Sequence, residues 1–283
     1  METIIKVDIN RLEPHPEDPF KLYTEEKLKE LAASIAEIGL IHPICVRPYE
    51  DGRYQILAGK NRAAAFALLG LTYIDAVILD VDDDTAIMVI TDSNLKHREK
   101  LLPSEKAHAY KLRLEAVKNR KKPGKSIKNG TSAQVGHQGK AEYIVANENK
   151  VSRQNVRRHI RLTYLIKELL DEADKDNLPL TTGVSLSYLD EAAQQAVYRC
   201  CYATSDDGVS MADAAYLKRA LNENLAPVTD DLIRSLLAEH KILTSGKPFT
   251  IDRVKLSPYV GKLPDDKRLM RMFLEWMEEI GVI

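Results

Sequence analysis

Apolar positions in the first hundred residues form two kinds of pattern, a helical repeat and short runs typical of strands. One set recurs at helical spacing, at Leu28, Leu31, Ala32, Ile35 and Ile38. Thr24 stands before this set as an N-cap and Gly39 after it as a stop, so the pattern predicts an amphipathic helix. Elsewhere, short apolar runs bounded by turn residues predict strands at 4–9, 44–49, 54–58 and 73–79. Asp51-Gly52 between the second and third run supplies the positive dihedral angles of a tight hairpin.

Helical signals fill the rest of the chain. In the first hundred residues they fall at about 60–70 and 83–95. Beyond Pro103 they predict helices at 103–118, 141–147, 152–170, 185–202, 210–224, 228–240 and 265–280. Residues 119–140, rich in Lys, Gly, Asn and Ser, predict a basic loop. These patterns divide the chain into an α+β domain at 1–100, an all-α domain at 101–180 and a helical C-terminal region at 181–283.

The composition is that of a globular protein, with 283 residues, 44% hydrophobic and 29% charged. No apolar run approaches the roughly 20 residues of a membrane-spanning helix, and the first residues lack a secretory pattern. Cys45, Cys200 and Cys201 lack metal-ligand spacing and predict core positions in a reducing compartment. We therefore expect a cytoplasmic protein without a membrane partner.

Charge is distributed unevenly. The chain has a net charge of -1, yet residues 113–161 hold 13 Lys or Arg and three Glu. A basic segment on an otherwise acidic chain is typical of a surface that docks on a polyphosphate backbone. A solvated basic linker is the alternative.

Two predicted helices with a short turn between them, at 141–147 and 152–170, have the spacing of a helix-turn-helix. Ser152 is a natural N-cap, and Val156 and Ile160 are expected to pack against Ile144 and Val145. The polar positions of the second helix predict contacts to double-stranded DNA. They are Ser152, Arg153, Gln154, Asn155, Arg157, Arg158 and Arg161, with Arg153, Arg157 and Arg161 on one face. An ordinary arginine-rich surface helix is the competing interpretation.

Five blocks of residues, in this order and spacing, resemble the N-terminal domain of the ParB/Spo0J/RepB partition proteins. They are Leu31-Ala-Ala-Ser-Ile35 with Gly39-Leu-Ile-His-Pro-Ile44, Leu57-Ala-Gly-Lys-Asn-Arg62, Asp92-Ser-Asn-Leu95, Arg98-Glu, and Leu102-Pro-Ser-Glu-Lys-Ala107. With the helix-turn-helix, the resemblance covers about residues 1–170. The sequences of the last blocks resemble those of family members encoded on plasmids and mobile elements.

The resemblance implies a ParB/sulfiredoxin-like α+β domain that binds CTP with magnesium, in a dimeric clamp on a centromere site. It places Gly59, Lys60 and Arg62 on the triphosphate, Asn94 on the nucleotide and the metal, and Arg98 at the end of the third block. It further implies a homodimer, a ParA-type ATPase as partner, and association with the nucleoid or a plasmid.

The chain departs from the family pattern in the second block. Where the family usually has Gly-Glu-Arg-Arg, this chain has Gly59-Lys-Asn-Arg62, without the acid and with one arginine fewer. Phosphate binding remains expected, and any hydrolysis is at most a slow CTPase activity. In sulfiredoxin, which the domain also resembles, this loop carries a catalytic cysteine; none lies in 59–62, so that activity is not expected.

Three functions compete at this point. The first is a centromere-binding partition protein, and the second is a ParB-like transcriptional or replication regulator without a nucleotide switch. The third is a nucleotide hydrolase or kinase of the ParB/sulfiredoxin-like group. An apolar stripe in the last predicted helix, which includes Leu269, Phe273 and Trp276, indicates either self-association or a core helix.

Overall fold

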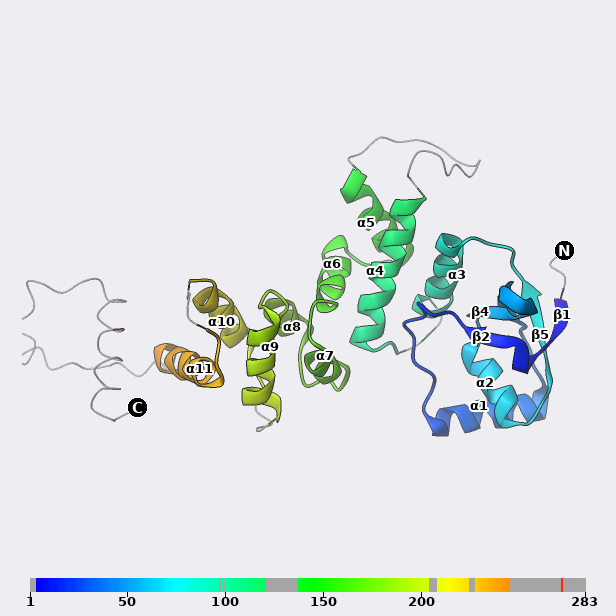
Figure 1. The fold of residues 1–283 in the computed structure, drawn as a ribbon, viewed down its shortest axis with the longest axis horizontal. Coiled ribbons are helices and arrows are strands. Elements are labelled where there is room, and N and C mark those ends of the chain that lie inside the picture. Colours follow the sequence, from blue (N-terminus) through cyan, green and yellow to red (C-terminus); the bar gives the residue numbers. More distant parts are fainter. Residues whose placement is uncertain are drawn as a thin grey trace, which may run out of the picture. The chain divides into compact units, whose positions relative to one another are not determined.

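The computed structural model describes residues 4–96, 98, 100–120, 137–203, 208–223, 227–244 and 271 (Figure 1). The chain divides into two compact units, Met1–Ala238 and Glu239–Ile283. Both candidate sites lie in the first unit. The predicted helix at 265–280 lies outside the described residues, apart from Arg271.

A five-stranded mixed sheet forms the N-terminal part. Its strands are β1 (Ile4–Asp8), β2 (Leu12–Pro14), β3 (Ile44–Pro48), β4 (Tyr54–Ala58) and β5 (Tyr73–Ile78), in the order β1-β5-β3-β4-β2. β3 and β4 form the predicted antiparallel hairpin, and Asp51 and Gly52 have φ angles of 54° and 69°. The short strand β2, which pairs in parallel with β4, was not predicted. Its three residues are too few to show a period.

The two faces of the sheet carry different helices. Ile56 packs in a cluster with α1 (Glu25–Ile38) and α2 (Lys60–Leu68), whereas Leu57 packs with α3 (Asp83–Leu95) and α4 (Pro103–Asn119). Consecutive strand residues face opposite sides, so β4 is buried on both faces. This fixes the end of β4, where the turn into α2 begins.

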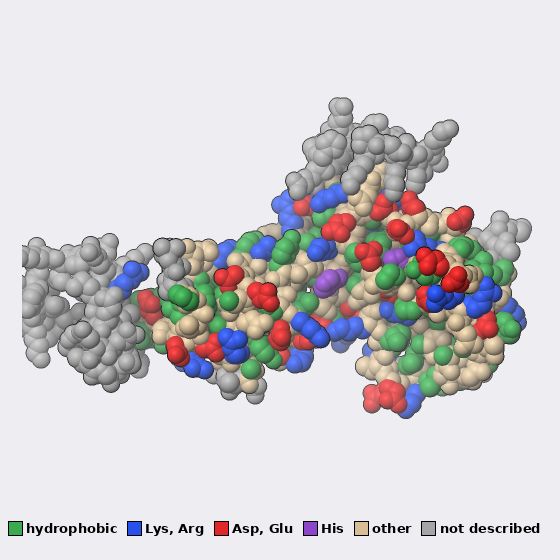
Figure 2. All heavy atoms as spheres, viewed as in Figure 1, with side chains coloured by type: hydrophobic (Ala, Val, Ile, Leu, Met, Phe, Trp, Pro, Cys, Tyr) green, Lys and Arg blue, Asp and Glu red, His purple; other side chains and the backbone are tan. Residues whose placement is uncertain are grey.

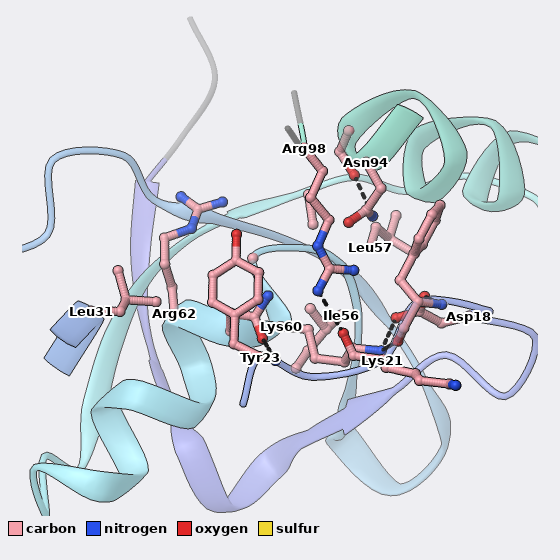
Figure 3. Close-up of a pocket in the computed structure, with 15 residues that line it drawn as sticks. Asp18, Lys21, Tyr23, Leu31, Ile56, Leu57, Lys60, Arg62, Asn94 and Arg98 are labelled. Carbon is pink, nitrogen blue, oxygen red and sulfur yellow. Dashed lines mark hydrogen bonds and ion pairs between the residues drawn. The ribbon is translucent and has the colours of Figure 1, made fainter. Parts of the chain in front are cut away.

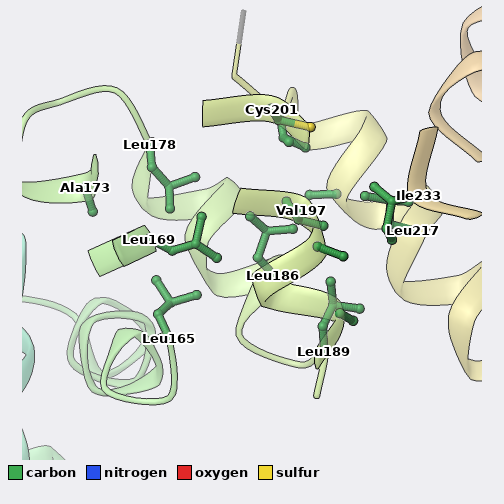
Figure 4. Close-up of a cluster of buried hydrophobic side chains, with 14 of the residues drawn as sticks. Leu165, Leu169, Ala173, Leu178, Leu186, Leu189, Val197, Cys201, Leu217 and Ile233 are labelled. Atoms are coloured by element: carbon green, nitrogen blue, oxygen red, sulfur yellow. The ribbon is translucent and has the colours of Figure 1, made fainter. Parts of the chain in front are cut away.

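Helices make up the remainder of the described chain. They are α5 (His137–Glu148), α6 (Arg153–Leu162), α7 (Lys167–Asp174), α8 (Leu180–Leu186), α9 (Glu191–Tyr198), α10 (Met211–Glu223) and α11 (Asp230–Thr244). A large apolar cluster joins α7 to α11, with Leu169, Leu186 and Leu217 fully buried (Figure 4). A second cluster packs α4 against α5 and α6 through Tyr110, Val145 and Val156. Among the described helices none is long and apolar enough to cross a membrane.

Several predicted helix boundaries were wrong. The helix predicted at 141–147 already begins at His137, so the last residues of the predicted basic loop are helical. Residues 121–136 of that loop lie outside the described residues. The helix predicted at 152–170 is interrupted between Leu162 and Lys167, where Thr163, Tyr164 and Leu165 donate to carbonyls three residues back. This tight turn directs Leu165 into the large apolar cluster.

The helix predicted at 185–202 is also divided. Asp190 caps a new helix by accepting a hydrogen bond from the Ala193 amide at 2.8 Å, which separates α8 from α9. Of the three cysteines predicted for the core, Cys201 is buried, whereas Cys45 and Cys200 are half-buried. Tyr188, which we also expected to fill this helical region, is half exposed to solvent and is not a core residue.

Candidate functional site

A pocket of about 310 Å³ lies between the turn from β4 to α2 and the end of α3 (Figure 3). It brings together the five residues predicted for nucleotide binding, which are Gly59, Lys60, Arg62, Asn94 and Arg98. Segments nearly 40 positions apart in the sequence therefore line one cavity.

Gly59 lets the backbone of the turn approach its neighbours closely. Its φ angle is +99°, in the left-handed region that side chains with a Cβ rarely adopt. A Cβ at this position would lie 2.6 Å from Cγ2 of Ile44 and 2.8 Å from Nη2 of Arg62. Both restrictions require glycine, and they let Ile44 and the guanidinium of Arg62 pack directly against the backbone of the turn.

Arg62 is held by backbone carbonyls. Its Nη1 donates to the carbonyl oxygens of His42 and Pro43, the latter at 2.9 Å. Burial lowers the pKa of this guanidinium from its ordinary value. An anion in the pocket would offset the cost of that burial, because no described carboxylate is paired with Arg62.

Lys60 is already engaged. Its Nζ lies 2.6 Å from Oδ2 of Asp18 and also donates to the carbonyl oxygen of Phe20. A lysine is a point charge without a fixed donor geometry. Its positive charge is therefore neutralised by Asp18 and is available to a ligand only if a phosphate displaces that carboxylate.

Arg98 and Asn94 stand on the opposite side of the pocket. Arg98 donates to Oε1 of Glu105 at 3.1 Å and to the carbonyl oxygen of Lys21, and its guanidinium lies 4.9 Å from the centre of the Tyr23 ring. Nδ2 of Asn94 donates to the Ile90 carbonyl at 2.9 Å, which turns its amide oxygen toward Arg98 (Figure 3).

Sequence reasoning missed the residues that hold these groups in place. Asn61 accepts a hydrogen bond from the Tyr23 amide at 2.9 Å, and Glu105 accepts one from the Lys21 amide at 2.8 Å. Glu105 also caps α4 by accepting from the Leu102 amide, and its place two residues after Pro103 signals that role. Nothing in the proline-rich segment before Tyr23 indicated a pocket wall.

The described residues contain no group of three or more His, Cys, Asp or Glu side chains that could hold a metal ion. Of the residues predicted for magnesium, Asn94 offers one amide oxygen. A magnesium ion here would need phosphate oxygens and water as its other ligands.

The second predicted site lies on α5 and α6, which a short turn connects. Ser152 caps α6, since its Oγ accepts a hydrogen bond from the Asn155 amide at 3.1 Å. Val156 is fully buried against Val145, and Ile160 and Ile144 flank the same cluster, as predicted. The polar side of α6 is left facing outward.

The seven residues predicted for DNA binding are all at least partly open to solvent, and Arg161 is half-buried. Ser152, Arg153, Gln154, Arg157 and Arg158 are exposed, and Asn155 is half-buried. No carboxylate among the described residues lies within ion-pair distance of Arg153 or Arg158, whereas Arg157 pairs with Glu142 of α5 at 2.6 Å. Lys and Arg side chains are visible over α5 and α6 in the space-filling view (Figure 2).

Arg161 is placed differently. Its Nε donates to Oγ of Ser187 at 2.9 Å, and its guanidinium lies 3.9 Å from the centre of the Tyr188 ring. The shared face of Arg153, Arg157 and Arg161 therefore ends in a side chain that is bound to α8 and its C-terminal turn.

Comparison with known proteins finds one domain family, two similar relatives and two similar solved structures. Residues 1–95 match the ParB N-terminal domain family. The chromosome-partitioning protein Spo0J of Thermus thermophilus is 40% identical over 112 residues, which are 40% of this chain and 41% of that protein. A nucleoid occlusion protein of Geobacillus is 39% identical over 114 residues, 40% of each chain. The chain thus matches about two fifths of the length of these relatives.

Among solved structures, a C-terminally truncated ParB of Caulobacter crescentus in complex with the centromeric parS site is similar with 22% identity and a TM-score of 0.44. That similarity covers 76% of this chain and 99% of the other. Sulfiredoxin of Arabidopsis thaliana matches 31% of this chain and 97% of its own with 30% identity and a TM-score of 0.27.

Proposed function

We propose that the chain, whose residues 1–95 match the ParB N-terminal domain family, is a site-specific, centromere-binding protein for plasmid or chromosome partition, switched by CTP. The observation that carries the proposal is the convergence of Gly59, Arg62, Asn94 and Arg98 on one pocket, in the same compact unit as the exposed arginines of α6.

The pocket fits a nucleoside triphosphate in three respects. The missing side chain at Gly59 lets the guanidinium of Arg62 lie directly against the turn, so that both the turn backbone and Arg62 line the pocket. Arg62 and Arg98 supply two guanidinium groups from opposite sides, and each offers a planar donor fork. The oxygen of Asn94 is available to a magnesium ion that also binds the phosphates.

The same pocket argues against rapid hydrolysis. Position 60 holds a lysine in place of an acid, and the nearby carboxylates of Asp18 and Glu105 are paired with Lys60 and Arg98. No described carboxylate is left to activate a water molecule beside the phosphates. We therefore propose at most a slow CTPase activity.

On the DNA side, α6 is proposed to enter the major groove of double-stranded DNA as the second helix of a helix-turn-helix. Gln154 and Asn155 have the amide geometry for adenine, whereas Arg153 and Arg158 suit guanine or phosphate. The symmetry of typical operators favours a homodimer, and a ParA-type ATPase is the proposed partner of the complex on a nucleoid or plasmid.

The first experiment measures binding of radiolabelled CTP, ATP and GTP with magnesium, with and without DNA fragments of the host replicon. Selective CTP binding that rises with one fragment supports the proposal and identifies the site. Arg62→Ala should then abolish CTP binding, whereas Arg53→Ala, which removes an exposed arginine paired with Glu13, should leave it unchanged. Absence of nucleotide binding, beside tight binding to one fragment, would contradict the nucleotide switch.

Tight DNA binding without nucleotide binding would favour a ParB-like regulator that has no nucleotide switch. The ion pair between Lys60 and Asp18 favours this second function, because it withdraws from the pocket a charge that a triphosphate would need. The two functions differ on a closed DNA circle: only a CTP-dependent clamp should be released from its site when CTP is added.

A further inference from the structure

Five side chains from separate helices and turns form a row in which cations alternate with aromatic rings. Nζ of Lys111, in α4, lies 5.9 Å from the centre of the Tyr164 ring, and the Arg161 guanidinium lies 4.5 Å from the same ring. Arg161 also lies 3.9 Å from the centre of the Tyr188 ring, and Nζ of Lys218, in α10, lies 3.6 Å from it. We refer to these five residues as the tyrosine–cation ridge.

The three positive charges of the ridge lack acidic partners. Among the described residues, no carboxylate lies within ion-pair distance of Lys111, Arg161 or Lys218. The aromatic rings attract these cations without neutralising them. Tyr164 and Tyr188 remain 56% and 50% exposed, and Lys111, Arg161 and Lys218 are half-buried, so the ridge presents two phenol groups and parts of three cations to solvent.

The ridge continues the proposed DNA-binding surface. Arg161 follows Arg153 and Arg157 at intervals of four and thus lies on the same face of α6. Beyond Arg161, the row passes to Tyr188 and to Lys218, which lie outside the helix pair.

We propose that the tyrosine–cation ridge binds the sugar–phosphate backbone of the duplex beside the bases that α6 contacts. This inference rests on the proposed function and extends its footprint to α4 and α10. Lysine ammonium groups and tyrosine hydroxyls donate hydrogen bonds to phosphate oxygens, and such contacts set the position of a protein on DNA without reading its sequence.

The groove next to the ridge is unsuited to phosphate. Glu168, Asp190 and Glu191 line it together with Arg161 and Tyr188. Their charges exclude an anion from the groove, so phosphate contacts are confined to the ring edges and the ammonium groups of the ridge.

The test compares the double variant Lys111→Ala/Lys218→Ala with the unmodified chain on two duplexes. One carries a site selected by the protein from a random-sequence pool with flanking base pairs, and the other is trimmed to the site. Each phosphate contact contributes about 0.9 to the slope of log affinity against log salt concentration. On the long duplex we expect the slope to fall by about 2, with an equal loss for every sequence. On the trimmed duplex the variant should match the unmodified chain.

The matched control is Lys27→Ala/Lys29→Ala, which removes two exposed lysines from α1, far along the chain from the ridge. It should leave the slope unchanged. A Tyr188→Phe variant keeps the ring and tests the hydroxyl alone.

The outcomes separate the two proposals. If the unmodified chain binds DNA and the ridge variant keeps its full slope while its Tm falls, the ridge serves only internal packing and the inference is overturned. If the unmodified chain binds no duplex even at low salt, the proposed function fails together with it.

Discussion

The pocket beside Gly59 and the outer face of α6 are both rich in cations, but they differ in how many of these cations the protein itself engages. In the pocket, Lys60 and Arg98 are paired with Asp18 and Glu105. On α6, Arg153 and Arg158 have no carboxylate within ion-pair distance among the described residues. The protein thus engages each of the pocket cations Lys60, Arg62 and Arg98. On the outer face of α6 it pairs Arg157 with Glu142 but leaves Arg153 and Arg158 exposed.

This difference predicts two kinds of binding. A ligand of the pocket must replace or extend existing contacts, and so depends on shape and on rigid neighbours. A ligand of α6 meets exposed charges, and its affinity should depend strongly on salt. Variants that act on one region alone, on both, or within α6 test this distinction.

The largest effect is expected from Gly59→Ala. The backbone φ angle of +99° at this position would be strained for alanine, and the added Cβ would collide with Ile44 and Arg62. We expect the free energy of unfolding to fall by about 2–4 kcal/mol, measured by urea denaturation, and CTP binding to be lost. Gly70→Ala is the control: its φ is also positive, at +68°, but its Cβ would meet nothing within 4 Å. Equal losses in the two variants would show that the close approach at Gly59 is unimportant.

Arg113 connects the two regions, and its removal should affect both. This side chain is only 3% exposed; its Nη2 lies 2.9 Å from Asp92 of α3 and 2.9 Å from Glu148, at the end of α5. Asp92 precedes Ser93 and Asn94, which line the pocket, and Glu148 precedes the turn into α6.

We expect Arg113→Met to lower the free energy of unfolding by about 2–3 kcal/mol, because Glu148 loses its ion-pair partner and the Met88 carbonyl loses a donor, whereas Asp92 keeps its pair with Lys96. DNA affinity and CTP affinity should both fall. Arg53→Met, which breaks an exposed pair with Glu13, should cost less than about 1 kcal/mol. A stable Arg113→Met variant with only one affinity reduced would show that the regions are independent.

The sequence predicted which residues form both regions, but it did not predict which partners their cations have. The two short runs beside Asp51-Gly52 placed β3 and β4, and the Asp51-Gly52 turn placed the hairpin, because both signals are local. The partner of Lys60 is 42 positions away at Asp18, and that of Arg161 is Ser187, so no local pattern reported either contact. Long-range packing also interrupted the helix predicted at 152–170, where Leu165 enters the large apolar cluster.

Within α6, an unpaired and a paired arginine allow an internal comparison. We expect Arg153→Ala to weaken binding to the selected DNA site by about 5- to 30-fold, measured by fluorescence anisotropy, since a direct contact to a base or phosphate is lost. Arg157→Ala should weaken it less, because Arg157 must first separate from Glu142 to contact DNA. A larger effect at Arg157 than at Arg153 would contradict the view that the open charges carry the binding.

The smallest effect is expected on the buried side of α6, at His159. Desolvation by burial lowers the pKa of its imidazole, and nearby Lys106 adds to this, while the hydrogen bond from Nδ1 to the Asn155 carbonyl opposes it. The folded state thus favours the neutral ring, whereas the unfolded chain takes up a proton near pH 6.5. The stability that His159 contributes is therefore complete above about pH 6.5 and is lost as the pH falls toward the lower pKa of the folded state.

We expect the Tm of the unmodified chain to fall by a few degrees between about pH 7 and pH 5, and His159→Phe to show a shallower fall. Phenylalanine keeps the edge contact with the Tyr110 ring, whose centre lies 5.6 Å from that of His159, but takes up no proton. The pKa of His15 is also lowered by burial, so part of the pH dependence should remain in the variant. Identical slopes in both proteins would mean that α6 stays packed on α4 whatever the charge of His159, and that its buried side is as insensitive to protonation as its outer face.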